Sequence, residues 1–254
     1  MTSDWPPETA RSLVEALLDA RRSGRKLGTV DLPVPPTIVA ARAVQAAITA
    51  ALGDEIEGWK VSVRPDGTAI SAPVRPFLRQ GRDRLLMPWR RGMGLEVEIA
   101  FQLGRQPVDQ PAATMPPGCI PDFVEAIHLG IEIIDGRLAE ESRSPFALFL
   151  ADSLDNGGYA LGPRLPETIL SELLAQNVGI SVGGAATWSG IARHPLADPC
   201  LPMIASIQQK TIAAHSPSGF VVTTGSLCGI IPVSSPGTVD ISILSYGDMR
   251  FEFE

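Results

Sequence analysis

The residues Leu95-Glu-Val-Glu-Ile-Ala-Phe-Gln-Leu103 alternate between apolar side chains at odd positions and polar or small ones at even positions. This period of two predicts a β-strand with one buried face. Glu96 and Glu98 then point to the other face, with Cα atoms roughly 7 Å apart. On a solvent-exposed face this pair would be ordinary acidic surface, whereas in a pocket the two carboxylates would need a cation.

A third carboxylate, Glu132, lies between isoleucines in the apolar run Gly130-Ile-Glu-Ile-Ile-Asp135. Such a glutamate lies either on the wet face of a strand or close to a partner charge. Three oxygen ligands carried by strands suit a hard divalent ion, and magnesium or manganese (Mg2+ or Mn2+) more than zinc. We therefore predict that Glu96, Glu98 and Glu132 are metal ligands.

The composition favours a folded protein and disfavours polyanionic partners. The chain has 254 residues, of which 44% are hydrophobic, and its net charge is −7. This length and composition allow a sizeable core, and the negative charge disfavours nucleic acid and anionic membranes as partners. The first residues show no secretory signal, so we expect a cytoplasmic protein.

Local patterns predict a single domain over residues 1–254, with a helical N-terminal subregion at 1–55 and a β-rich metal-binding core at 56–254. No linker between the two is long or polar enough to argue for independent domains. Apolar spacing and end signals predict helices and strands. The helices are Glu8 to Arg22, Thr37 to Gly53, Asp122 to Leu129 and Leu196 to Gln208, and the strands include Ile56 to Val63 and a hairpin of Val239 to Leu244 with Met249 to Phe253.

Three further places carry polar residues, and the first two have two interpretations each. Lys60 lies between Trp59 and Val61 in a predicted strand, either as a lysine with a wet ammonium or as an amine held in a site. In Thr223-Thr-Gly-Ser226, backbone N–H groups and hydroxyls of Thr224, Gly225 and Ser226 could receive a carboxylate, or simply form a strand and its turn. Turn chemistry explains Asp155-Asn156-Gly157 adequately but Asp152 less well.

Together these segments resemble the hydratase/decarboxylase branch of the fumarylacetoacetate hydrolase superfamily over nearly the whole chain. That branch includes 2-oxopent-4-enoate hydratases and 2-oxo-3-hexenedioate decarboxylases. The resemblance rests on the order of Gly58-Trp-Lys60, Glu96-x-Glu98, Gly130-Ile-Glu-Ile-Ile-Asp-Gly-Arg137, Ala151-Asp152 with Asn156, Gly162-Pro163, His194-Pro-Leu196 and Thr223-Thr-Gly-Ser226.

The resemblance implies an α+β fold, a mixed β-roll or flattened barrel with N-terminal helices. It also implies a magnesium or manganese ion and a homo-oligomer built from dimers. The true hydrolases of the superfamily end their ligand set with an aspartate and carry a lysine near the position of Asp152, whereas this chain has Glu132 and Asp152. The sequence departs from its relatives at Asp155 and in the segment from Pro65 to Pro73, and both departures bear on the choice of substrate.

The activity expected from the resemblance is that of a lyase. The first choice is a hydratase that adds water to a 2-hydroxy-2,4-dienoate to give a 4-hydroxy-2-oxo acid in the breakdown of aromatic compounds. The alternatives are a 2-oxo-3-hexenedioate (4-oxalocrotonate) decarboxylase, an acylpyruvate C–C hydrolase and a non-catalytic binder of 2-oxo acids. Lys60 is the predicted acid/base, Asp152 or Asp135 would handle a second proton or position water, and Arg137 would hold one of these acids, with Asn156 among the substrate-binding candidates.

Overall fold

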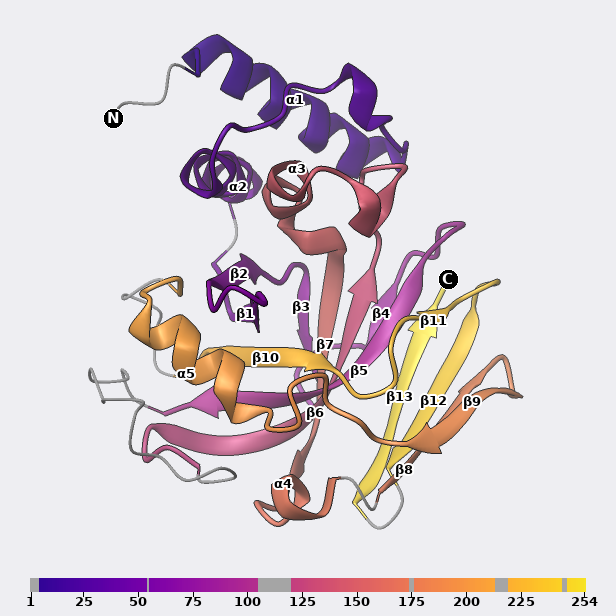
Figure 1. Ribbon diagram of the computed structural model, residues 1–254. Helices are drawn as coiled ribbons and strands as arrows, with labels where there is room; N and C mark the ends of the chain where they lie inside the picture. Colours follow the sequence, from indigo (N-terminus) through magenta and orange to yellow (C-terminus); the bar gives the residue numbers. More distant parts are fainter. Residues whose placement is uncertain (1–4, 54, 105–119, 174–175, 213–218, 244–245) are drawn as a thin grey trace. The chain divides into compact units, whose positions relative to one another are not determined.

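The computed structural model describes residues 5–53, 55–104, 120–173, 176–212, 219–243 and 246–254 (Figure 1). The chain divides into two compact units. The first unit comprises Met1–Glu55 and Asp135–Gly157, and the second comprises Ile56–Ile134 and Gly158–Glu254. The helical subregion expected over residues 1–55 thus shares a unit with a later segment of the chain.

The first unit is helical. It contains α1 (Pro7–Ser23), η1 (Thr29–Asp31), α2 (Ile38–Leu52), η3 (Glu141–Arg143), α3 (Phe146–Ala151) and η4 (Ser153–Asp155). The Thr37 side chain caps α2 by accepting the Ala40 N–H at 3.1 Å, and left-handed glycines follow α1 and α2 at Gly24 and Gly53. These are ordinary helix start and stop signals, and both predicted N-terminal helices are confirmed.

The second unit holds two mixed β-sheets within its described residues (Figure 1). The larger sheet has the order β2-β1-β10-β5-β6-β7-β3, with β11 paired to β5, and the smaller has the order β4-β13-β12-β8-β9. Short helices α4 (Ile169–Glu172) and α5 (Cys200–Gln208) complete the unit. The strands are β1 (Gly58–Val63), β2 (Ala69–Pro73), β3 (Phe77–Arg79), β4 (Leu86–Met87), β5 (Gly94–Leu103), β6 (Val124–Ile134), β7 (Asn156–Leu165), β8 (Asn177–Val182), β9 (Ala185–Ile191), β10 (Val221–Ser226), β11 (Ile231–Pro232), β12 (Gly237–Ile243) and β13 (Gly247–Phe253).

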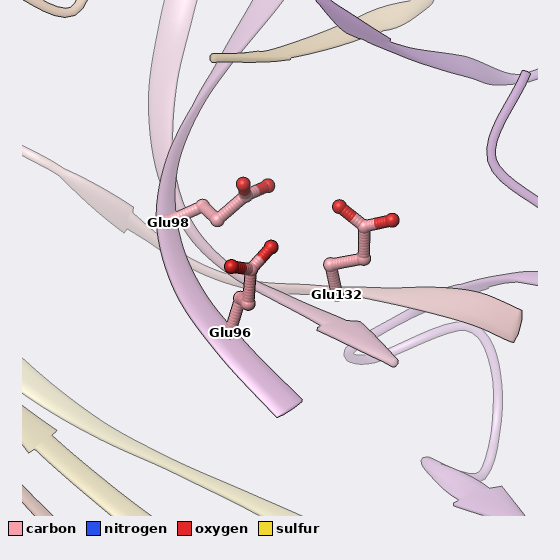
Figure 2. A group of neighbouring side chains, drawn as sticks. All are labelled: Glu96, Glu98 and Glu132. Atoms are coloured by element: carbon pink, nitrogen blue, oxygen red, sulfur yellow. The ribbon is translucent and has the colours of Figure 1, made fainter. Parts of the chain in front are cut away.

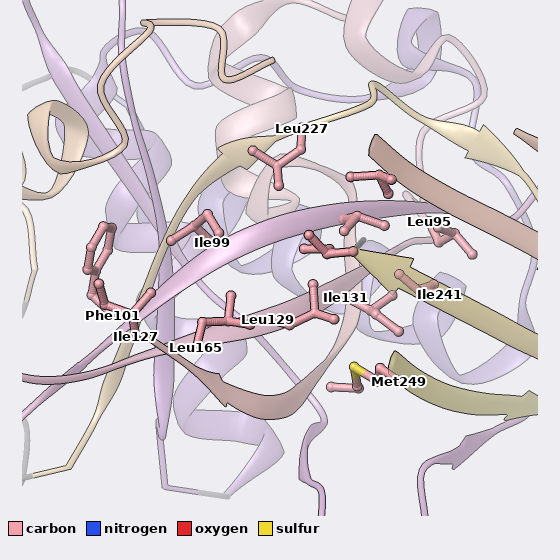
Figure 3. Close-up of a cluster of buried hydrophobic side chains, with 14 of the residues drawn as sticks. Leu95, Ile99, Phe101, Ile127, Leu129, Ile131, Leu165, Leu227, Ile241 and Met249 are labelled. Atoms are coloured by element: carbon pink, nitrogen blue, oxygen red, sulfur yellow. The ribbon is translucent and has the colours of Figure 1, made fainter. Parts of the chain in front are cut away.

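The antiparallel pair β5 and β6 forms the centre of the core of the second unit. Its register places Leu95 opposite Ile133, Val97 opposite Ile131, Ile99 opposite Leu129 and Phe101 opposite Ile127. All eight of these side chains are at most 2% exposed. Figure 3 labels Leu95, Ile99, Phe101, Ile127, Leu129 and Ile131 among the buried hydrophobic side chains. Because side chains alternate along a strand, the even positions of both strands share the opposite face.

The structure corrects two sequence-based predictions, the type of one element and the start of another. The helix predicted from Asp122 to Leu129 is wrong, since Val124–Ile134 is the strand β6. Apolar side chains at every second position from Ile127 pair with those of β5, and this burial outweighs the local helical pattern. The helix predicted from Leu196 begins at Cys200, whose N–H is accepted by Asp198 Oδ1 at 2.9 Å.

The hairpin predicted near the C-terminus is confirmed, because β12 and β13 pair antiparallel with Val239 opposite Phe251. The predicted strand that contains Lys60 is also confirmed, as β1. Among the described residues, no helix is both long and apolar enough to cross a lipid bilayer.

Candidate metal centre

Three glutamates meet on the face of β5 and β6 that lies opposite the core (Figure 2). The strand register places Glu96 directly opposite Glu132 and Glu98 opposite Gly130. Each glutamate offers a carboxylate oxygen that lies within 4.8 Å of the others. Glu98 is 2% exposed and Glu132 is 0% exposed, so this acidic face is not ordinary solvated surface.

The cluster concentrates negative charge in a buried place. Two unit charges 4.8 Å apart repel by about 3 kcal/mol at an effective dielectric constant of about 20. Like charges directly opposite on antiparallel strands are also unfavourable. Burial raises the pKa of Glu98 well above its usual range, and the carboxylates of Glu132 and Glu96 raise this pKa further.

A divalent cation fits this donor set. All three ligands are carboxylate oxygens, which hard ions such as magnesium and manganese prefer. A cation of charge +2 would attract each of the three carboxylates and offset their mutual repulsion. Glu96, Glu98 and Glu132 are therefore the residues of the second unit that would hold such an ion.

Lys60 lies beside this cluster. Its Nζ contacts Glu132 Oε1 at 2.7 Å, and the Lys60 side chain is 17% exposed. The ammonium is thus bound to a buried carboxylate rather than left in water, which favours the interpretation of Lys60 as an amine held in a site. In the parallel pairing of β1 with β10, Lys60 is the neighbour of Thr223.

The pKa of Lys60 moves in the direction opposite to the one that burial alone predicts. Burial lowers this pKa, but the carboxylates of Glu132, Glu96 and Glu98 together raise it by more, so it lies above its usual value. In the sequence, the apolar neighbours Trp59 and Val61 indicate the burial of Lys60 but not the three acids around its amine. An ion that neutralised those acids would remove the cause of the increase.

Two residues outside the predicted site set are linked to the acid cluster, Thr223 directly and Tyr159 through Thr223. Thr223 Oγ1 donates to Glu98 Oε2, and Tyr159 Oη donates to Thr223 Oγ1 at 3.0 Å. Thr223 was visible only as part of the Thr-Gly-Ser segment, and nothing in the local sequence linked Tyr159 on β7 to that segment. Their link depends on the strand order of the sheet.

The predicted carboxylate-binding segment, Thr224 to Ser226, forms a bulge in β10. The pairing with β5 shifts by one residue between Thr223 and Ser226, which lies opposite Glu98. The Thr224 carbonyl accepts a hydrogen bond from His194 Nε2 at 2.9 Å, and Ser226 Oγ donates to the Gly229 carbonyl at 2.9 Å. Gly225 has a φ of 130°, which favours glycine. The bulge is therefore held by its own contacts, next to Glu98.

The other predicted site residues come together in the first unit. Arg137 N–H donates to Asp152 Oδ2 at 2.7 Å and Arg137 Nε pairs with Asp152 Oδ1. Arg137 Nη1 also donates to the carbonyls of Asp135 and Asn156, each at 2.7 Å. The Asp135 carboxylate lies 3.7 Å from Lys26 Nζ. Arg137 thus holds Asp152, as one of the sequence-based expectations had it.

Asp155 follows Ser153 and Leu154 in a run of three buried residues with φ values of 55°, 55° and 62°. Three consecutive left-handed residues other than glycine are unusual and carry backbone strain. The sequence marked Asp155 as a departure from the resembled family, and the structure places it in this run, between α3 and β7.

The comparisons with known proteins support a fold but no closer assignment by sequence. No family model matches the chain, and no curated protein matches it in sequence. Among solved structures, 4-oxalocrotonate decarboxylase from Pseudomonas putida G7, complexed with magnesium and adipate, is 18% identical, covers 98% of both chains and has a TM-score of 0.73. The same enzyme with calcium and acetate is 19% identical over 98% of both chains, with a TM-score of 0.72.

A fumarylacetoacetate hydrolase family protein from yeast is 13% identical and has a TM-score of 0.52, over 78% of this chain and 92% of the yeast chain. At these identities the similarity is one of fold. The expected α+β architecture with a mixed β-roll is confirmed. The chain therefore has the fold of the fumarylacetoacetate hydrolase family structures and of 4-oxalocrotonate decarboxylase.

Proposed function

We propose that the chain is a divalent-metal-dependent lyase of the fumarylacetoacetate hydrolase superfamily that acts on a small 2-oxo acid. The observation that carries the proposal is the buried cluster of Glu96, Glu98 and Glu132 with the Lys60 amine bound to one of its members. If these glutamates were an ordinary solvated surface, neither their burial nor the buried ion pair with Lys60 would be expected. Magnesium and manganese are among the ions that an all-carboxylate site favours.

When bound, a divalent cation supplies positive charge that stabilises an enolate of the 2-oxo acid. Lys60 is the residue of this chain that would move protons to or from the substrate carbon atoms, since its Nζ lies beside the acid cluster. Glu132 orients that amine through the 2.7 Å contact. The bulge at Thr224 to Ser226 presents backbone groups next to Glu98, where a substrate carboxylate would be received.

Two lyase reactions share this enolate chemistry. Hydration of a 2-hydroxy-2,4-dienoate is the activity that the sequence favours, because acids outnumber bases among the candidate residues. Decarboxylation of a 2-oxo-3-hexenedioate is favoured by a different observation, the match over 98% of both chains to 4-oxalocrotonate decarboxylase. That structure also holds adipate, which carries two carboxylates.

One experiment tests the proposal and separates these reactions. Purified protein with magnesium is offered 2-hydroxypenta-2,4-dienoate and 2-oxohex-3-enedioate, and loss of dienoate absorbance and release of carbon dioxide are followed separately. Hydration of the monoacid supports the hydratase, and carbon dioxide from the diacid without hydration of the monoacid supports the decarboxylase. The Glu98→Gln variant, purified in the same way, controls for contaminating enzymes.

The remaining outcomes would overturn the proposed lyase. Cleavage of an acylpyruvate, with neither lyase reaction, would make the protein a C–C hydrolase. Binding of 2-oxo acids without turnover of any of these substrates would make it a binding protein.

Assembly as a homo-oligomer built from dimers stays a prediction, for which the mass of the purified protein in solution is the test.

A further inference from the structure

We propose that Tyr159 and Thr223 are positioning residues that fix the orientation of Glu98 for metal binding through a one-way relay of two hydroxyl groups. The inference rests on the proposed metal site and adds two residues that do not themselves bind the ion. Tyr159 is 0% exposed and Thr223 is 1% exposed, so the relay is shielded from water.

The direction of the relay follows from the chemistry of its three groups. An ionised carboxylate can only accept hydrogen bonds, and a threonine hydroxyl has one proton to donate. Thr223 Oγ1 donates that proton to Glu98 Oε2. The Thr223 oxygen is then an acceptor, and Tyr159 Oη donates to it at 3.0 Å. Tyr159 therefore acts on Glu98 only through Thr223.

The lack of a side chain at Gly130 leaves room in the sheet for the Tyr159 hydroxyl. Gly130 lies opposite Glu98 on the neighbouring strand, and a Cβ at Gly130 would lie 1.8 Å from Tyr159 Oη. No side chain can stand at position 130, opposite Glu98 on β6, while Tyr159 keeps its place. The tyrosine ring stacks on Phe77 with 5.5 Å between ring centroids and an interplanar angle of 19°, which holds the hydroxyl in position.

Such a relay would matter because a glutamate is a flexible ligand. Fixing a glutamate side chain costs up to about 2 kcal/mol of rotamer entropy. Glu132 is already held by Lys60 at 2.7 Å, and the relay gives Glu98 a corresponding partner. Partners of this kind commonly change metal affinity by about 10- to 100-fold.

Conservative variants remove the relay one step at a time. Thr223→Val keeps the side-chain shape but removes the hydroxyl, and Tyr159→Phe keeps the ring on Phe77. We expect Thr223→Val to weaken manganese binding by about 10- to 100-fold and Tyr159→Phe to weaken it by less. Because Tyr159 acts through Thr223, the double variant should bind no more weakly than Thr223→Val alone.

The measurement is manganese binding to the chelated full-length protein, by calorimetry or by the electron paramagnetic resonance signal of free manganese. Thermal unfolding without metal is recorded for each variant as a check of folding. Thr223→Ser, which restores a hydroxyl, should recover most of the affinity lost in Thr223→Val. Matched controls are Tyr246→Phe and Thr187→Val, whose hydroxyls contact Glu172 and the Ala185 carbonyl, and neither should change manganese binding.

The outcomes separate the relay from the metal site itself. If the wild type binds manganese through its glutamates but Thr223→Val binds equally well, the relay is wrong and the metal site stands. Additive losses in the double variant, or no recovery in Thr223→Ser, would also overturn it. If the wild type binds no manganese, the proposed metal site fails before the relay is reached.

Discussion

Replacing Glu98 by glutamine should stabilise the metal-free protein at neutral pH and remove its response to metal. Glutamine has nearly the shape of glutamate and can still accept the Thr223 hydroxyl, but it carries no charge. The ligand oxygens lie within 4.8 Å of one another. At an effective dielectric constant of about 20, each ionised pair at this distance repels by about 3 kcal/mol.

Glu98 can escape part of this repulsion by binding a proton, so we expect a gain of about 1 to 3 kcal/mol in the free energy of unfolding. For a chain of this size each kcal/mol moves the melting temperature by about 2 to 4 °C. The sign of the pH dependence follows from the raised pKa of Glu98, whose first cause is burial. Stability linked to this group is present below the ordinary glutamate pKa and is lost as the pH rises through the higher folded-state value.

The advantage of Glu98→Gln over the wild type should therefore be close to zero at pH 4 and grow towards neutral pH. The assay is thermal or denaturant unfolding in chelator across this range, with the exposed Glu167→Gln in the same unit as control. With manganese at about 100 times its dissociation constant the wild type should gain about 2.7 kcal/mol, and the variant far less. A variant less stable than the wild type without metal at neutral pH, or a difference independent of pH, would refute the reasoning.

Three further predictions concern Lys60, the protons released when manganese binds, and the ion pair of Arg137 with Asp152. At saturating manganese, Lys60→Met should lose about 10²- to 10⁴-fold in kcat, because the proton-transfer group is gone. Steady-state kinetics measure this, and a kcat close to that of the wild type would exclude Lys60. Manganese binding should release protons and tighten as the pH rises, since burial and like charges raise the pKa of Glu98. Calorimetry in buffers of different ionisation enthalpy detects the released protons, and identical binding heats in all buffers would contradict this prediction. Asp152→Asn should lower the free energy of unfolding by about 3 to 5 kcal/mol, because it leaves the buried Arg137 guanidinium without its carboxylate. Denaturant unfolding measures this, and a loss below about 1 kcal/mol would mean that the ion pair does not stabilise the fold.

The strand-borne part of the site was accessible from sequence because a period of two fixes which side chains share a face. It placed Glu96 and Glu98 together on β5 and left Leu95 and its odd-numbered neighbours for the core. The direct opposition of Glu96 and Glu132 was not accessible, since it depends on the register between β5 and β6. The first residues of β6 were misread as a helix for the same reason.

Contacts between residues that are far apart in the sequence could not be predicted from it. Tyr159 and Thr223 are 64 positions apart, and only the strand order of the larger sheet brings them to Glu98. The net direction of the Lys60 pKa also depends on three acids from two other strands, whereas the sequence showed only its apolar neighbours. Residues 135–157 join the N-terminal helices in one unit, which no local pattern indicated.

The central claim is that three glutamates from two strands bind one divalent cation, and a manganese titration of the chelated protein tests it most directly. Wild type, Glu96→Gln, Glu98→Gln and Glu132→Gln are compared by calorimetry under identical conditions. The account predicts one manganese ion per chain in the wild type and markedly weaker binding in each variant, because each loses a charged oxygen ligand. Manganese affinity unchanged in all three variants would contradict it.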